Sequence, residues 1–192
     1  MSLLAHETAH RWLAFLRFLD HDRQASDALL GRQMAHWSFF MDTDASVMEG
    51  NDIEALGGGA FRTAARFQRF SLLDQYAMGL VGEADVPPFF HVESPVNVSG
   101  GQDAASAPAV GVTFNGTRRD VLMADVIAVM GPRVPPAAES PKVHRQAFLY
   151  VVGAGRSADA AAIDKIDRIR RAWEPFFTEV TGGRMRVETR LR

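Results

Sequence analysis

Cysteine is absent from this sequence of 192 residues. Its absence excludes disulfide bonds, a thiolate metal site and a cysteine nucleophile. The 21 lysine and arginine residues nearly balance the 23 aspartate and glutamate residues, and a formal net charge of −2 does not favour a nucleic-acid partner. No hydrophobic run is long enough to predict a membrane span, and no secretion signal is recognisable. With 47% hydrophobic residues, the chain is expected to be globular with a core of its own.

The first ten residues contain the pattern His-Glu-x-x-His, formed by His6, Glu7 and His10. Apolar residues at helical spacing predict a helix from about Ser2 to Leu19 around this pattern. Residues four apart lie on one face of a helix, so both imidazoles can bind one zinc ion. Glu7 can then act as general base on a zinc-bound water, which is the chemistry of a zinc peptidase. The alternative is an amphipathic helix whose histidines bind no metal.

A catalytic zinc ion takes three protein ligands and one water molecule, so a third ligand must come from another segment. Asp74 is the preferred candidate, because it lies in an otherwise apolar predicted helix and an unpaired buried carboxylate is costly. His36 is the second candidate. Tyr76 is a candidate donor to the oxyanion of the transition state. The alternatives left open are that Asp74 caps a helix or pairs with an arginine, and that Tyr76 is a core residue.

Three later segments, 36–38, 46–50 and 73–80, follow the zinc motif in an order that resembles a group of predicted bacterial zincin-like metallopeptidases. Asp74 followed by Tyr76 also loosely resembles the aspzincins, with the tyrosine one residue nearer to the aspartate. The resemblance covers about residues 1–90 and implies a zincin-like fold, a zinc site and peptidase activity. It does not identify a substrate.

A zincin usually has a β-sheet before the metal-binding helix, whereas here the motif begins at His6. We therefore expect a truncated start, so that the N-terminal sheet is missing. The alternative is that later segments build this sheet. If a preceding segment exists, an extracytoplasmic location in a bacterium is expected.

The predicted fold class is α+β, with mixed helices and short strands. Residues 1–98 are expected to form the metal-binding catalytic region, and residues 99–192 a C-terminal α+β region packed on it in the same domain. Asn115-Gly116 gives the clearest hairpin signal, because this dipeptide adopts the positive φ angles of a type I′ turn. The other predicted elements are helices at 25–34, 72–80, 124–130 and 157–173, the last ended or kinked by Pro175, a turn at 57–59, a strand or helix start at 60–67, and extended segments or strands at 36–41, 89–98, 146–152 and 184–191.

Together these features predict a zinc-dependent peptidase that acts on a peptide or protein substrate. The alternative is a catalytically inactive binding or structural domain derived from a metallopeptidase. The sequence carries no signal for the oligomeric state or for substrate preference.

Overall fold

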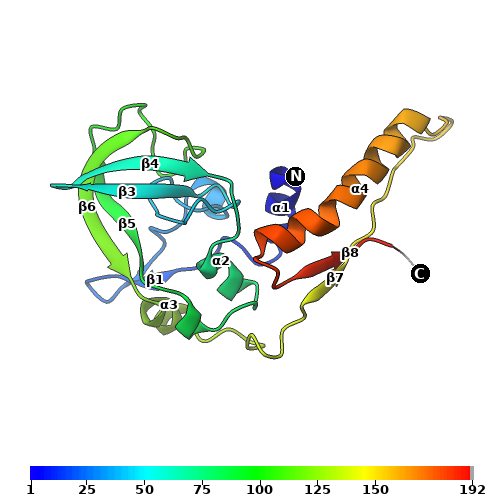
Figure 1. Ribbon diagram of the computed structural model, residues 1–192. Coiled ribbons are helices and arrows are strands. Elements are labelled where there is room, and N and C mark those ends of the chain that lie inside the picture. Colours follow the sequence, from blue (N-terminus) through cyan, green and yellow to red (C-terminus); the bar gives the residue numbers. More distant parts are fainter. Residues whose placement is uncertain (191–192) are drawn as a thin grey trace. The chain divides into compact units, whose positions relative to one another are not determined.

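The computed structural model describes residues 1–190, and the chain divides into two compact units (Figure 1). The first unit is Ser2–Ser140, and the second begins at Pro141. Helices and several small sheets occur together, so the α+β class is confirmed. The predicted division at residues 98 and 99 falls between two strands that pair in the first unit. No helix within residues 1–190 combines the length and apolar character needed to cross a membrane.

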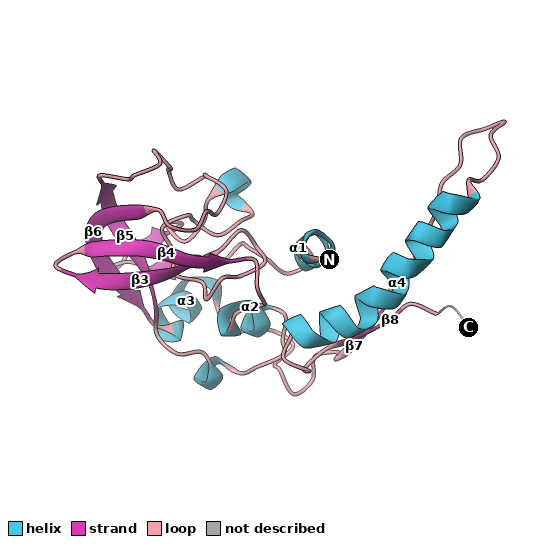
Figure 2. Cartoon of the chain, turned by 45° about the horizontal axis from the view of Figure 1, so that its top comes forward, coloured by secondary structure: helices cyan, strands magenta, loops and turns pink. Residues whose placement is uncertain are grey.

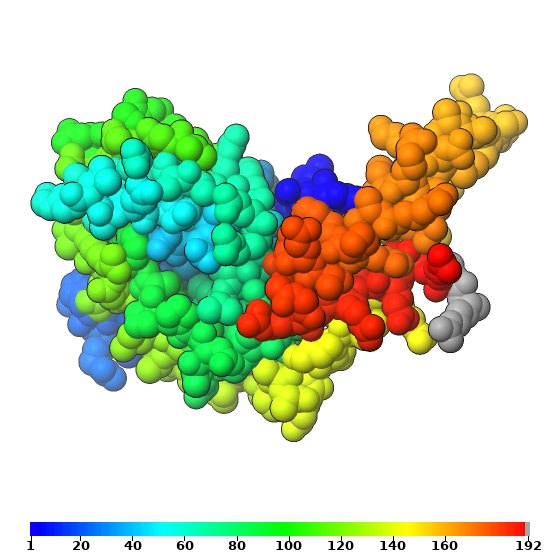
Figure 3. All heavy atoms as spheres, in the orientation of Figure 1, coloured from blue at the N-terminus to red at the C-terminus, as the bar shows by residue number. Residues whose placement is uncertain are grey.

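The first unit is built on a four-stranded antiparallel sheet in the order β3-β4-β6-β5 (Figure 2). Its strands are β3 (Asn51–Gly57), β4 (Ala60–Arg66), β5 (Phe89–Val96) and β6 (Thr113–Val121). Aromatic and branched side chains from the sheet and from the segment before it form the core, namely Phe39, Phe40, Ile53, Phe61, Phe90, Val92, Val112 and Phe114. Figure 3 shows part of β3 and β4, coloured cyan, at the surface, where the outer ends of these strands carry exposed side chains.

Of the two turns predicted from glycine residues, one forms and the other does not. Gly57, Gly58 and Gly59 all have positive φ angles and link β3 to β4, as predicted. The hairpin predicted at Asn115-Gly116 is wrong, because both residues lie inside the continuous strand β6. A Cβ atom on Gly116 would lie 2.4 Å from Cγ1 of Val92 on β5, so this glycine permits close approach of two strands.

The helices of the first unit are α1 (Ser2–Ala9), α2 (Leu72–Ala77) and α3 (Met123–Met130). The short helices predicted near α2 and α3 are confirmed. The first helix ends about ten residues before its predicted end at Leu19. Leu13 and Ala14 are fully buried, so the chain leaves the helical path to place them in the core. It continues into β1 (Phe18–Leu19), which pairs with β2 (Ala25–Ser26).

The segment between β2 and β3 forms a closed loop. The helix predicted at 25–34 and the strand predicted at 36–41 are both wrong, because only one 3-10 turn, Arg32–Met34, forms here. Leu30 and Trp37 pair in an isolated bridge, and the N–H of Gly31 donates to the carbonyl of His36 at 2.8 Å. These bonds fold the chain back on itself and fix the backbone of His36.

The second unit packs α4 (Ala160–Val180) with a parallel pair of strands, β7 (Val143–Arg145) and β8 (Arg186–Glu188). The helix continues through Pro175, so of the two predicted alternatives, an end or a kink, the end near residue 173 is wrong. Phe177 and Val180, beyond the proline, are buried, and this packing outweighs the local cost of the ring.

The strand predicted at 146–152 is also wrong, because this segment is an exposed loop in which Leu149 is 80% accessible. The alternation predicted for the last strand is confirmed at Met185, Val187 and Thr189, which are all buried. Leu191, the last residue of that predicted strand, lies outside the described residues.

Candidate metal centre

The His-Glu-x-x-His pattern lies at the end of α1. His6 is inside the helix and His10 directly follows its last residue, with the N–H of His10 donating to the carbonyl of His6 at 3.3 Å. This last turn keeps both imidazoles on one side, and their ring centroids are 4.8 Å apart. The spacing of the motif therefore has the predicted geometric effect, although the helix is much shorter than predicted.

The loop between Leu30 and Trp37 brings a third imidazole to this pair. The ring of His36 lies 5.0 Å from the rings of both His6 and His10. Its Nε2 atom is 3.2 Å from Nε2 of His6. One nitrogen of each ring lies within 4.8 Å of the others, and no other group of His, Cys, Asp and Glu within residues 1–190 has this arrangement.

Each histidine is oriented by a bond from its other ring nitrogen to a backbone carbonyl. Nδ1 of His6 donates to Val47 at 2.9 Å, Nδ1 of His36 to Arg32 at 2.7 Å, and Nδ1 of His10 to Leu13 at 3.2 Å. A carbonyl only accepts, so the proton of each neutral ring is inferred to lie on Nδ1. The Nε2 atoms of His6 and His36 then face each other, and a cation between them would bind both lone pairs, replacing the hydrogen bond that Nε2 of His36 accepts from Arg32.

One of the three nitrogen pairs has the separation expected of two ligands on one zinc ion. With Zn–N bonds of about 2.0–2.1 Å, tetrahedral coordination places two nitrogen ligands about 3.3 Å apart. The 3.2 Å between the Nε2 atoms of His6 and His36 is close to this value. Burial lowers the pKa of His36, which favours the neutral imidazole that a metal requires.

Arg32 and Glu49 form an ion pair beside the histidines, which the sequence reasoning missed. Nε of Arg32 donates to Glu49 at 2.9 Å, and Nη2 of Arg32 donates to Nε2 of His36 at 3.3 Å. Burial acts to raise the pKa of Glu49, but the hydrogen bond from Arg32 and the nearby histidines hold that pKa below its usual range. The bond to Glu49 raises the pKa of Arg32. The sequence holds no spacing that links residues 32 and 49, because a loop brings them together.

Glu7 lines a cavity that also includes one histidine of this centre, His6. Arg32 and Glu49 line it too, and its volume is about 290 Å³. Glu7 itself is exposed, whereas His6 and His36 are 7% and 3% accessible. The centre therefore combines two buried imidazoles, those of His6 and His36, with the partly buried His10 and with a carboxylate that remains in contact with solvent.

Asp74 is not brought to the three histidines. It is fully buried at the start of α2, where its carboxylate accepts bonds from Nε1 of Trp37 at 2.8 Å and Oγ of Ser46 at 2.6 Å. It also accepts from the N–H of Ser71 at 2.8 Å, in a capping box. Burial raises the pKa of Asp74 to about 6, although these donors act to lower it. Of the alternatives considered from the sequence, the structure places Asp74 as a helix cap, and His36 occupies the third position of the metal group.

Tyr76 is buried on α2, and its hydroxyl oxygen accepts a hydrogen bond from the backbone N–H of Arg133 at 3.2 Å. This contact involves the segment after α3 and none of the three histidines. Its placement agrees with the alternative of a core residue.

The three segments that carry the family resemblance contact one another beside the centre. His36 belongs to the first, Val47 of the second accepts the bond from His6, and Asp74 of the third joins both through Trp37 and Ser46. Comparison of the chain with models of protein families, with curated proteins and with solved structures finds no match. Membership of the metallopeptidase group therefore stays a prediction.

Proposed function

We propose that this protein is a zinc-dependent hydrolase of the zincin-like peptidase type, acting on peptide bonds. The observation that carries this proposal is the convergence of three imidazoles, each oriented through Nδ1 by a backbone carbonyl. Structural zinc sites usually take four protein ligands, whereas catalytic sites take three and leave a position for water. Among the described residues, the centre offers three.

The residues of the centre divide into ligands and a base. His6, His10 and His36 would hold the ion through their Nε2 atoms. A bound zinc ion would lower the pKa of its water to near neutrality and polarise a carbonyl group. Glu7 follows His6 on α1 and lines the cavity, so its carboxylate is the group that can accept a proton there and release it to the leaving amine.

Arg32 is the cation closest to this chemistry. Its Nη2 atom reaches His36 at 3.3 Å, and Glu49 holds the guanidinium in place. A fixed positive charge stabilises negative charge that develops on a substrate oxygen. We assign this role to Arg32, in place of the role first expected of Tyr76.

Elemental analysis of the purified protein tests the metal centre. About one zinc per chain is expected, and none in His10→Ala. His21→Ala is the matched control, because His21 is exposed and outside the group of three. If zinc content stays low in every form after dialysis against zinc, the metal centre is wrong.

Hydrolysis of unstructured peptides by zinc-loaded protein tests the chemistry. Glu7→Gln should keep the zinc and lose activity by about a hundredfold or more, since a general base contributes this much. Glu54→Gln, on the exposed outer part of β3, should leave the activity unchanged. Zinc that is bound with no peptidase activity in the unmodified protein would instead assign a non-catalytic metal-binding domain.

A further inference from the structure

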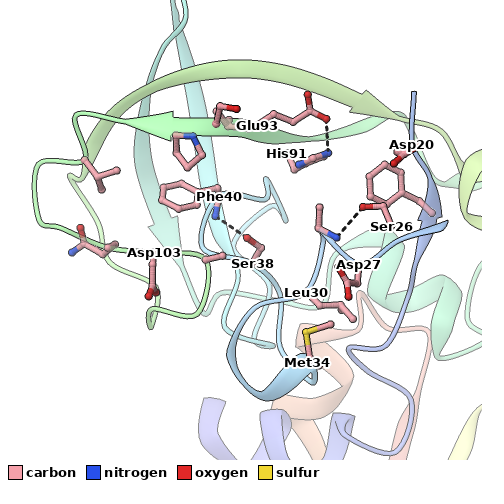
Figure 4. Close-up of a pocket in the computed structure, with 18 of the residues that line it drawn as sticks. Asp20, Ser26, Asp27, Leu30, Met34, Ser38, Phe40, His91, Glu93 and Asp103 are labelled. Carbon is pink, nitrogen blue, oxygen red and sulfur yellow. Dashed lines mark hydrogen bonds and ion pairs between the residues drawn. The ribbon is translucent and has the colours of Figure 1, made fainter. Parts of the chain in front are cut away.

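A second and larger cavity lies in the first unit (Figure 4). Its volume is about 550 Å³, within the usual range of small-molecule sites. Its walls come from β5, from the segment that contains β1 and β2, and from the loop around Asp103. None of the three clustered histidines lines it, so it is distinct from the candidate metal centre.

The charged residues of this cavity are almost all of one sign. Asp20, Asp27, Glu93 and Asp103 line it, and no lysine or arginine does. Asp20, Asp27 and Asp103 form no ion pair with any residue in the described part of the chain. The bonds that Asp20 and Asp103 accept come from backbone N–H groups and a serine hydroxyl, which do not neutralise a carboxylate.

His91 provides an independent indication of a ligand. It lines the cavity, is only 5% accessible, and its Nε2 atom has no hydrogen-bond partner among residues 1–190. The carboxylate of Glu93 lies 3.8 Å from this atom, which is beyond hydrogen-bonding distance and makes an ion pair only if the ring is protonated. A buried polar atom without a partner is costly, and a ligand with an N–H group would satisfy it.

The protonation state of His91 decides whether its ring can accept a hydrogen bond from a ligand. Burial lowers the pKa of this imidazole; Glu93 opposes the shift, and Arg119, the residue opposite His91 on β6, adds to it. The lowered pKa favours the neutral imidazole, which has one nitrogen with a lone pair for a donor. Arg119 does not line the cavity.

The remaining wall is largely apolar. Phe18 packs its ring against His91 with centroids 5.4 Å apart, and Leu30, Phe40 and Val98 add aliphatic and aromatic surface. An apolar wall beside several carboxylates suits a molecule with a hydrocarbon body and a cationic end.

We propose that this cavity binds an organic cation, a protonated primary amine carried on a short aliphatic chain. The ammonium group lies among the carboxylates and donates to Nε2 of His91, and the chain packs on Phe18 and Leu30. This inference is independent of the proposed hydrolase, because it uses no residue of the metal centre.

Calorimetric titration of the whole chain with cadaverine tests this proposal, with and without zinc. Saturable binding is expected in both cases, whereas glutarate and 1-pentanol, which have no cationic end, should not bind. A short lysine-containing peptide with both ends blocked distinguishes a free amine from a side chain as the natural source. No saturable binding of either amine, or equal binding of 1-pentanol, would overturn the proposal.

Variants locate the site. Glu93→Gln and Asp27→Asn should each weaken cadaverine binding by about fivefold. His91→Phe, which keeps a ring of similar size, should weaken it by about tenfold. Glu83→Gln is the matched control, since Glu83 is exposed and outside the cavity. Thermal unfolding of each variant checks that it folds, and affinities unchanged in all three folded cavity variants would place the amine elsewhere.

Discussion

The three-histidine centre and Asp74 are both largely buried polar groups, but they differ in the partners of their acceptor atoms. The carboxylate of Asp74 accepts from Trp37, Ser46 and Ser71, so its hydrogen-bonding capacity is largely used. The Nε2 atoms of His6 and His36 instead face each other at 3.2 Å. A candidate metal ligand is therefore recognised by a ring nitrogen that points at another such nitrogen, and burial alone does not identify one; in His36 a bound ion would replace the hydrogen bond from Arg32.

Among the variants that test this comparison, the largest expected effect is the loss of zinc affinity when His36 is replaced. His36→Ala should reduce zinc affinity by roughly a hundredfold or more, because two ligands remain of three. Asp74→Asn should keep about one zinc per chain. Competition with a chromogenic chelator measures both affinities. If Asp74→Asn loses zinc while it stays folded, and His36→Ala retains it, then Asp74 is the ligand and the comparison is reversed.

Replacing Asp74 should affect stability more than metal binding. Asp74→Ala leaves the donors of Trp37, Ser46 and Ser71 without their acceptor, and we expect a loss of about 3 kcal/mol in the free energy of unfolding. Asp85→Ala is a suitable control, because Asp85 makes a similar bond to the N–H of Gly82 at an exposed site. Urea unfolding measures the difference, and equal losses in the two variants would argue against a special role for burial.

Asp42 is a second carboxylate whose pKa is raised by burial, and it accepts fewer hydrogen bonds than Asp74. Burial raises its pKa to about 6, although the N–H groups of Ile53 and Asp44 act to lower it. The folded state then holds the proton more tightly than the unfolded state. The resulting stability is present below pH 4 and is lost as the pH rises through 6.

Asp42→Asn removes this titration and keeps one oxygen acceptor. Relative to the variant, the free energy of unfolding of the unmodified protein should fall by on the order of 2 kcal/mol from pH 4 to pH 7. Urea unfolding at several pH values measures it. Parallel pH profiles for the two proteins would contradict the raised pKa.

The smallest expected effect concerns the charge of Arg32 beside the histidines. Glu49→Gln removes the neutralising partner, so zinc binding should weaken by about fivefold. Glu54→Gln breaks a comparable ion pair with Arg62 on the exposed part of the sheet and should not change zinc affinity. An unchanged zinc affinity in Glu49→Gln would mean that the charge of Arg32 has no electrostatic effect on zinc binding.

The sequence predicted the parts of this molecule that depend on local spacing. His6 and His10 lie four residues apart, and a single helical turn is enough to pair them even though the helix ends at Ala9. The short apolar run likewise located α2.

The failures arise where tertiary contacts decide the structure. His36 was only the second candidate ligand, because a closed loop and not a helical repeat carries it to α1. Asp74 looked like a ligand because its three donors come from residues up to 37 positions away. Gly116 lies in a strand that pairs with β5, and its close approach to Val92 is a tertiary contact that no local pattern reveals.

A metal ion bound by these histidines would also stabilise the fold, because the histidines and the backbone carbonyls that orient them come from different segments. Val47 anchors His6, and His36 is separated from His6 by 30 positions, so one ion would cross-link α1, the loop after β2 and the segment before β3. A ligand that binds only the folded state raises its stability in proportion to the logarithm of the ligand concentration. The melting temperature of this unit would therefore report free zinc, and a chelator would loosen the N-terminal helix first.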